Sequence, residues 1–350
     1  MLHPDRPAMP RFARRLVAVL ALAALALPIA AQDFPPDTPR RPVATYSIVA
    51  HDAATGQFGV AVQSHWFSVG AIVPWAEAGV GAVATQSFVE PSYGPLGLEL
   101  MRLGRTAQQA LDALVSTDEG RAVRQVAFVD SEGNVAAHTG ESAIFAAGHR
   151  TGDGYSVQAN LMESDTVWDA MAEAYEASEG DLAERLLAAL EAAEAEGGDI
   201  RGKQSAAIVV VAGEPTGKPW QDRLFDLRVE DHPEPVAELR RLVGLQRAYQ
   251  QLNEGDAHVT DGDIEAAMQS YRAALTLAPD EANNGESAFW VGITLASVDR
   301  VDEALPYLAR AYAQDTRWAT LVPRLADAGL LPDDDALVQR LVVRMKAPEE

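Results

Sequence analysis

The residues ATYSIVAHD at positions 44–52 and QFGVAVQS at positions 57–64 are two largely apolar runs separated by only four residues. The short separator ends in Gly56, and both runs are rich in Val and small residues, which is typical of strands joined by a tight turn. We therefore expect an antiparallel hairpin here. Its first strand opens with a small residue followed by Thr45.

The pattern of apolar residues extends this hairpin into a larger sheet structure. Further strands are predicted at 79–86, 125–130, 135–138, 155–162, 204–212 and 223–229, and helices at 94–103, 106–116, 166–177 and 181–196. The order is strands, two helices, strands, two helices, strands. It predicts an α+β fold in which two sheets pack face to face with helices outside, a four-layer αββα sandwich. The alternative is an α+β sandwich without that topology.

The N-terminus has the pattern of an export signal. Arg11, Arg14 and Arg15 precede an apolar run at 16–27, which is followed by the small residues Ala30 and Ala31. This predicts a signal peptide at 1–31, export to the periplasm or the exterior, and no stable membrane insertion after cleavage. The alternative, an uncleaved anchor, needs a span of roughly 20 apolar residues. The Pro-rich segment 32–44 is predicted to be a linker.

Composition excludes several functions. The formal charge of −23 would repel a phosphate backbone, so we expect no nucleic-acid partner. The chain has no Cys, which rules out disulfides and thiolate chemistry. Its seven His residues are scattered without a ligand-like spacing, so neither a metal site nor a cofactor is expected.

Residues 235–350 have a helical pattern with an internal repeat. Gly255, Ala267 and Ala274 recur as Gly292, Ala304 and Ala311, each 37 positions later. Small residues at such spacings are typical of tetratricopeptide repeats, whose usual period is about 34 residues. A tetratricopeptide-like domain is therefore predicted, with an unrelated helical bundle as the alternative. Its groove is expected to suit a protein or peptide partner.

Thr45 is the residue most suggestive of chemistry. A Thr hydroxyl becomes a nucleophile when a base removes its proton, and a free α-amine on the same residue, with a pKa of about 8, can be that base. An amide nitrogen cannot. The alternative is that Thr45 is simply a β-branched residue at the start of a strand.

The segment 45–234 resembles a bacterial domain family of unknown function that is placed among the N-terminal-nucleophile (Ntn) hydrolases. The resemblance rests on TYSIVAHD at 45–52, GVAV at 59–62, VGAIVPW at 69–75, GVGAVATQ at 79–86, PSYGPLGL at 91–98, GDIRGKQS at 198–205 and DLRVEDHP at 226–233. It implies the αββα fold and an Ntn-type site. Short members of the family begin at or next to the Thr that corresponds to Thr45, whereas here a linker precedes it.

Four residues are predicted to make up the catalytic site. Thr45 would be the nucleophile, and the Ntn layout places the Ser64 hydroxyl near it, where Ser64 could relay a proton. The resemblance suggests Asn160 as a donor to the oxyanion, and Lys203 could lower the pKa of the nucleophile by its charge. The alternatives are a strand-end cap for Ser64, a turn residue for Asn160 and a surface charge for Lys203.

The resulting expectation is an exported amidohydrolase acting on a small peptide or acyl-amide. It requires two successive N-termini, near Gln32 and then at Thr45. The alternative is a non-catalytic periplasmic binding or scaffold protein that uses the same fold and its helical repeats to hold a peptide or protein.

Overall fold

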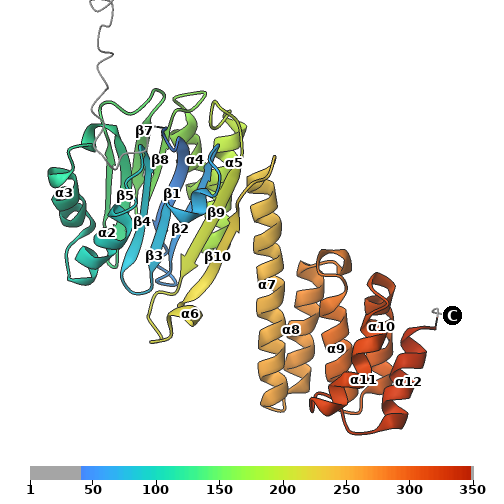
Figure 1. Cartoon of the computed structure of the whole chain (residues 1–350). Helices are drawn as coiled ribbons and strands as arrows, with labels where there is room; N and C mark the ends of the chain where they lie inside the picture. Colours follow the sequence, from blue (N-terminus) through green and yellow to red (C-terminus); the bar gives the residue numbers. More distant parts are fainter. Residues whose placement is uncertain (1–40, 348–350) are drawn as a thin grey trace, which may run out of the picture. The chain divides into compact units, whose positions relative to one another are not determined.

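The computed structural model describes residues 41–347, so the predicted signal peptide and most of the predicted linker lie outside the described residues. The described part is an α+β protein with two antiparallel sheets and a C-terminal helical region. The predicted α+β class is therefore confirmed (Figure 1).

The larger sheet has six strands in the order β10-β9-β2-β1-β8-β7. These are β1 (Thr45–His51), β2 (Phe58–Ser64), β7 (Gly148–Gly152), β8 (Tyr155–Asn160), β9 (Ser205–Val211) and β10 (Arg223–Val229). The predicted hairpin forms its centre, since β1 pairs antiparallel with β2 over the whole length of both strands.

The smaller sheet has four strands in the order β3-β4-β5-β6. These are β3 (Pro74–Glu77), β4 (Gly81–Ser87), β5 (Arg124–Asp130) and β6 (Val135–Thr139). Valines and alanines from the facing sides of both sheets form one buried core between them.

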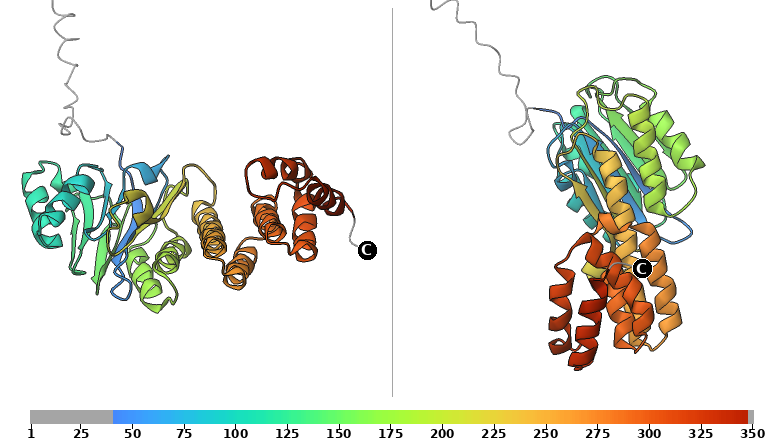
Figure 2. Two further views of the ribbon diagram at one scale, coloured as in Figure 1. Left: turned by 90° about the horizontal axis from the view of Figure 1, so that it is seen from below. Right: turned by 90° about the vertical axis from the view of Figure 1, so that its right-hand side faces the viewer.

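Helices cover the outer face of each sheet. The helices α2 (Tyr93–Arg102) and α3 (Ala107–Thr117) pack on the smaller sheet, while α4 (Val167–Ala177) and α5 (Leu182–Ala195) pack on the larger one (Figure 2). Each pair of helices forms a separate buried hydrophobic core with the sheet that it covers. Alternating residues of one strand therefore contribute to two different cores, as in β1, where Val49 faces the other sheet and Ile48 faces the helices.

Local signals in the sequence account for most of these elements. Thr106 caps α3 through a reciprocal pair of hydrogen bonds with Gln109, as its position before the apolar periodicity predicts. The short strands β3 and β7 and the single-turn helix α6 (Pro219–Asp222) were not predicted. These elements are too short to show a clear periodicity.

The C-terminal region comprises α7 (Pro235–Thr260), α8 (Ile264–Leu277), α9 (Glu286–Ser297), α10 (Val301–Gln314), α11 (Trp318–Asp327) and α12 (Asp335–Met345). Two glycines allow close packing of neighbouring helices here. A Cβ on Gly255 would lie 2.3 Å from the Tyr271 ring, and one on Gly292 would lie 2.6 Å from Leu308. The two glycines are 37 residues apart, and so are the residues that they contact, Tyr271 and Leu308. The sequence repeat therefore corresponds to a repeated packing contact.

The helix α7 contributes to two hydrophobic cores. Val236, Leu239 and Val243 belong to the core that includes α4, α5 and the larger sheet, whereas Leu252 belongs to the core of the helical region. The first half of α7 therefore packs as part of the sheet-containing domain. Arg240 reinforces this packing by pairing with Glu184 and Glu191 on α5.

The described helices show no candidate for a membrane span, because none combines the necessary length and apolarity.

The repeated contacts predict that the helical region does not tolerate larger side chains at its small positions. Ala304 on α10 is fully buried, so Ala304→Leu should overpack the core and lower the free energy of unfolding by about 1–3 kcal/mol. Urea denaturation followed by circular dichroism measures this loss. Ala313→Leu, an exposed position on the same helix, is the matched control. Equal stability of the two variants would contradict the packing argument.

Candidate active site

Four polar residues form a row across one end of the larger sheet. Strand register pairs Thr45 with Ser64 on one side and with Asn160 on the other, and it pairs Ser64 with Ser205 on β9. All four are fully buried and face the smaller sheet. Three of the predicted site residues, Thr45, Ser64 and Asn160, are thus brought together by adjacent strands.

A layer of hydrogen-bonded amides lies beside this row, between the two sheets. The Gln86 side chain of β4 accepts from Ser47 Oγ at 2.7 Å and donates to Gln125 Oε1 at 2.7 Å. Gln158 Nε2 donates to the same Ser47 hydroxyl at 2.6 Å. These side chains are fully buried, so their hydrogen bonds to one another replace those that water would have made.

The amide layer connects the two sheets to the main chain of Thr45. Gln86 Nε2 also donates to the Thr45 carbonyl oxygen at 3.3 Å, and Asn160 Nδ2 donates to Gln125 Oε1 at 3.0 Å. Displacing one amide would leave several buried acceptors without donors. The network therefore fixes the backbone position of Thr45.

From Gln125 the network continues towards an open cleft. Gln125 Nε2 donates to Thr139 Oγ1 at 2.9 Å, and this oxygen lies 2.8 Å from His149 Nδ1. The cleft has a volume of about 690 Å³, and its lining includes His149, Phe145 and Trp168. The Phe145 side chain is 83% exposed there.

The residues before Thr45 are part of the fold. Val43 exchanges two main-chain hydrogen bonds with Ser87, the last residue of β4, at 2.6 and 3.1 Å. Val43 and Ala44 are both fully buried, so the last two residues of the predicted linker 32–44 pack with the sheets. The Thr45 nitrogen is an amide in this form of the chain, and Thr45 Oγ1 donates to the Val43 carbonyl at 2.6 Å.

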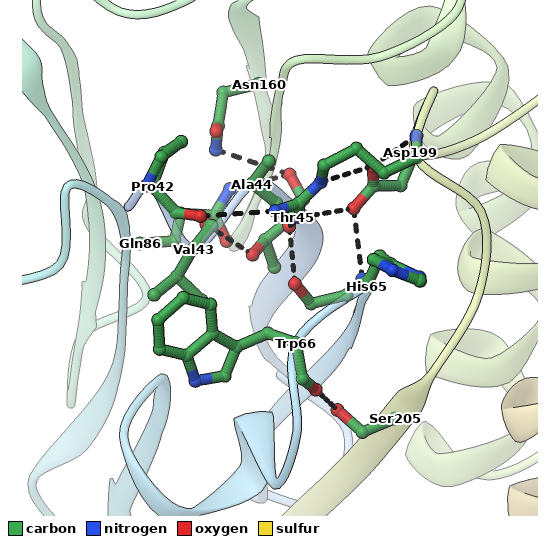
Figure 3. Close-up of polar contacts among 12 residues, drawn as sticks. Pro42, Val43, Ala44, Thr45, His65, Trp66, Gln86, Asn160, Asp199 and Ser205 are labelled. Atoms are coloured by element: carbon green, nitrogen blue, oxygen red, sulfur yellow. Dashed lines mark hydrogen bonds and ion pairs between the residues drawn. The ribbon is translucent and has the colours of Figure 1, made fainter. Parts of the chain in front are cut away.

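The carbonyl oxygen of Ala44 receives two side-chain donors (Figure 3). One is the Ser64 hydroxyl, and the other is Arg201 Nη2 at 2.9 Å. Arg201 is held in place by Asp199, whose carboxylate accepts from Nε at 3.0 Å and from Nη2 at 2.7 Å. A hydroxyl and a cation thus converge on the carbonyl of the Ala44–Thr45 peptide bond.

Unpaired polar atoms and an unusual backbone conformation occur at the same end of the sandwich. Asn160 Oδ1 and Ser87 Oγ are buried without a hydrogen-bond partner among the described residues. Ser87 (φ 69°) and Leu161 (φ 57°) both adopt left-handed backbone conformations, which cost roughly 1 kcal/mol or more for residues other than Gly. Buried groups without partners and strained residues are found together at many functional sites.

Within residues 41–347, no three His, Asp or Glu side chains are placed to hold a metal ion together.

The structure places Lys203 in a different environment from the other three predicted residues. Its ammonium pairs with Glu234 at 2.5 Å and with Glu194 at 3.2 Å. Hydrogen bonding to Glu234 is the main reason that the pKa of Lys203 is raised. Burial raises the pKa of Glu194 despite the lysine. Burial, and after it the charge of Glu194, raises the pKa of the Tyr46 phenol. The cation that lies beside Thr45 is instead Arg201, two residues before Lys203, which donates to the Ala44 carbonyl oxygen.

Sequence reasoning did not identify several residues that contact this site. Asp199 and Arg201 lie in the GDIRGKQS segment that carried the family resemblance, but charge type alone did not distinguish Arg201 from Lys203. Gln86 and Gln125 read as ordinary polar residues on strands. Each lies at one end of an apolar run, and only the structure shows that both side chains are buried.

Comparison with known proteins gives the family. The model of a family of unknown function, DUF1028, matches residues 45–239. The chain belongs to DUF1028. The chain is similar to the crystal structure of protein SPO2555 from Silicibacter pomeroyi, which also carries the DUF1028 family model, with 34% sequence identity and a TM-score of 0.51. The match covers 57% of this chain and 84% of that one. No curated protein matches the chain.

The amide layer should contribute strongly to the stability of this DUF1028 protein. Gln86→Ala removes the acceptor of Ser47 and the donor to Gln125, so the free energy of unfolding should fall by at least about 2 kcal/mol. Urea denaturation measures the loss. Gln108→Ala, which removes an exposed bond to Asp112, is the control. A loss no larger than that of the control would show that the layer does not hold the sheets together.

The raised pKa of Glu194 predicts a pH effect on stability. In the unfolded chain a Glu has a pKa of about 4.3, so the folded state binds this proton more tightly. The contribution of Glu194 to the free energy of unfolding is therefore greatest at low pH and is lost as pH rises through the folded-state pKa. The Glu194→Gln side chain cannot ionise. The free energy of unfolding of this variant, relative to that of the wild type, should therefore rise from pH 4 to pH 7.

Urea denaturation at several pH values gives this difference. Glu214→Gln, at an exposed position, is the control and should follow the wild type. A Glu194→Gln difference that stays constant with pH would contradict the assigned direction of the shift.

Proposed function

We propose that this DUF1028 protein is a self-processing amidohydrolase of the Ntn type, with Thr45 as its nucleophile. The observation that carries the proposal is the convergence of Ser64 Oγ and Arg201 Nη2 on the Ala44 carbonyl oxygen. That oxygen belongs to the bond whose cleavage would expose the Thr45 α-amine. The two antiparallel sheets with helices outside support placing the domain among Ntn hydrolases.

Self-cleavage at this bond is chemically balanced. Thr45 Oγ1 attacks the carbonyl carbon of Ala44, and negative charge develops on an oxygen that already has two donors. Each well-placed donor to such an oxyanion is worth roughly 3–4 kcal/mol. The C–N bond then breaks, and the hydroxyl proton passes to the Thr45 nitrogen. Water hydrolyses the resulting ester, which leaves an Ala44 carboxylate and a Thr45 residue with both its hydroxyl and a free amine.

In the cleaved protein the same groups would serve hydrolysis of an external amide. The Thr45 α-amine would act as the base. Asn160, whose Oδ1 atom has no hydrogen-bond partner within residues 41–347, lies opposite Thr45 in the register and would help to hold the substrate. Lys203 takes no part in this proposal, because Glu194 and Glu234 pair with its charge. Export follows from the predicted leader and remains part of the proposal.

A second candidate is a binding function of the helical region. The equivalent contacts at Gly255 and Gly292 support a tetratricopeptide-like arrangement of α7–α10. A cleft of about 800 Å³ between α7, α9 and the 329–332 segment is lined by Tyr249, Trp290, Glu286 and Asp256 among others. Such an aromatic and acidic lining suits a peptide with a basic side chain.

The first test is the intact mass of the purified full chain over time. We expect cleavage after Ala44, giving a product that begins at Thr45. Thr45→Ala should stay uncleaved, and Thr45→Ser should still be cleaved because its hydroxyl survives. Ser64→Ala should slow cleavage by about 100-fold through loss of one donor.

Thr85→Ala is the matched control, since Thr85 is a buried hydroxyl in the other sheet that donates to Glu90. It should be cleaved at the wild-type rate. Cleavage of Thr45→Ala at the wild-type rate would assign the cut to another protease. A wild-type chain that remains intact would leave the binding function as the better candidate.

A further inference from the structure

The segment 41–44 makes four kinds of contact that a substrate could reuse. Val43 adds to the smaller sheet like a short strand, through its two main-chain hydrogen bonds with Ser87. The Ala44 carbonyl is held by Ser64 and Arg201. The Pro42 carbonyl accepts from Arg201 Nη1 at 3.3 Å. Finally, the Arg41 guanidinium lies 5.5 Å from the centre of the Trp66 ring.

These contacts are the way in which a protein binds an extended peptide. Main-chain hydrogen bonds to a strand end supply affinity without regard to sequence, and pockets for individual side chains supply selectivity. Arg201 contacts two alternate carbonyls, those of Pro42 and Ala44, while its own position is fixed by Asp199. The segment therefore lies in a site built for a peptide backbone.

Burial of the segment indicates which side chains such a site would accept. Val43 and Ala44 have no exposed surface, so a residue larger than Ala next to the cleaved bond would need new space. The Val43 side chain belongs to the apolar core between the sheets, where a charged side chain would be strongly disfavoured. Arg41 is exposed and rests on Trp66, which favours a cation at that position.

We infer that the cleaved protein is a peptidase whose acyl-side subsites are those now filled by Arg41–Ala44. This inference rests on the proposed function. The substrate class is an extended peptide with a small residue before the cleaved bond, a β-branched aliphatic residue before that, and a basic residue two positions further towards its N-terminus. Peptides that end in the same sequence with a free carboxylate are bound as products, because Arg201 then faces a full negative charge.

The reaction uses only groups of this site and water. Thr45 Oγ1 attacks the substrate carbonyl, and the Thr45 α-amine takes the hydroxyl proton and delivers it to the leaving amine. The acyl group remains as an ester on Thr45. Water, deprotonated by the same amine, then attacks this ester and releases the peptide acid. Arg201 and Ser64 hold the oxygen that becomes negative in both steps.

The test uses protein that mass spectrometry shows to begin at Thr45 after its own cleavage. The probe is acetyl-Arg-Pro-Val-Ala carrying a fluorogenic amide at its C-terminus. Replacing the probe's Ala by Phe, or its Val by Asp, should lower kcat/KM at least tenfold. Replacing its Arg by Gln should lower kcat/KM about threefold. Acetyl-Arg-Pro-Val-Ala with a free carboxylate should inhibit at least tenfold more strongly than its C-terminal amide.

A variant pair separates the contribution of Trp66 from general loss of activity. Trp66→Ala should abolish the preference for Arg over Gln in the probe and retain the preferences for Ala and Val. Trp220→Ala, which removes an indole that is 74% exposed on α6, should keep all three preferences.

The outcomes distinguish this inference from the proposed function. A protein that begins at Thr45 but shows no preference for Ala over Phe and no inhibition by the carboxylate overturns the subsite assignment, while self-cleavage stands. A chain that never cleaves after Ala44 overturns both.

Discussion

Gln86 is the point at which the two sheets of this protein depend on each other. Its amide is buried between the sheets, where it accepts from Ser47, donates to Gln125 and also reaches the Thr45 carbonyl. A buried amide costs several kcal/mol if its hydrogen bonds are not made. The two sheets can therefore pack only in the arrangement that satisfies these side chains. The apolar residues around them would tolerate small shifts, but the amides would not.

The candidate site is a consequence of this constraint. Thr45 lies in the same row as Ser64 and Asn160 because strand pairing sets their register. The amide layer then fixes the Thr45 main chain from the side of the smaller sheet, and Arg201 with Asp199 fixes the Ala44 carbonyl from the other side. Groups held so firmly would need little reorganisation in the proposed self-cleavage, in which negative charge develops on the Ala44 oxygen.

The helix α7 shows how the helical region is attached to this domain. Its first half completes the core over the larger sheet, and its ion pairs with α5 lie on the same stretch. The sequence boundary at residue 234 marks the start of a helix. The packing, however, assigns the first turns of that helix to the sheet-containing domain. The family match, which extends to residue 239, agrees with that assignment.

The sequence by itself determined the order and type of most elements, because alternation, helical periodicity and caps such as Thr106 are local signals. The hairpin of β1 and β2 was also predicted from the sequence, whereas the pairing of β1 with β8, which brings Asn160 beside Thr45, appears only in the structure. The sequence did not determine the partners of charged side chains. Lys203 was the cation predicted for the site, yet it pairs with Glu194 and Glu234, and Arg201, two residues earlier, reaches Ala44. Only the tertiary structure decided this, because a loop residue takes its direction from the elements packed against it.

The same holds for residues 43 and 44. Their sequence predicts a linker, but both are buried because Val43 pairs with Ser87, a residue more than forty positions away in the chain.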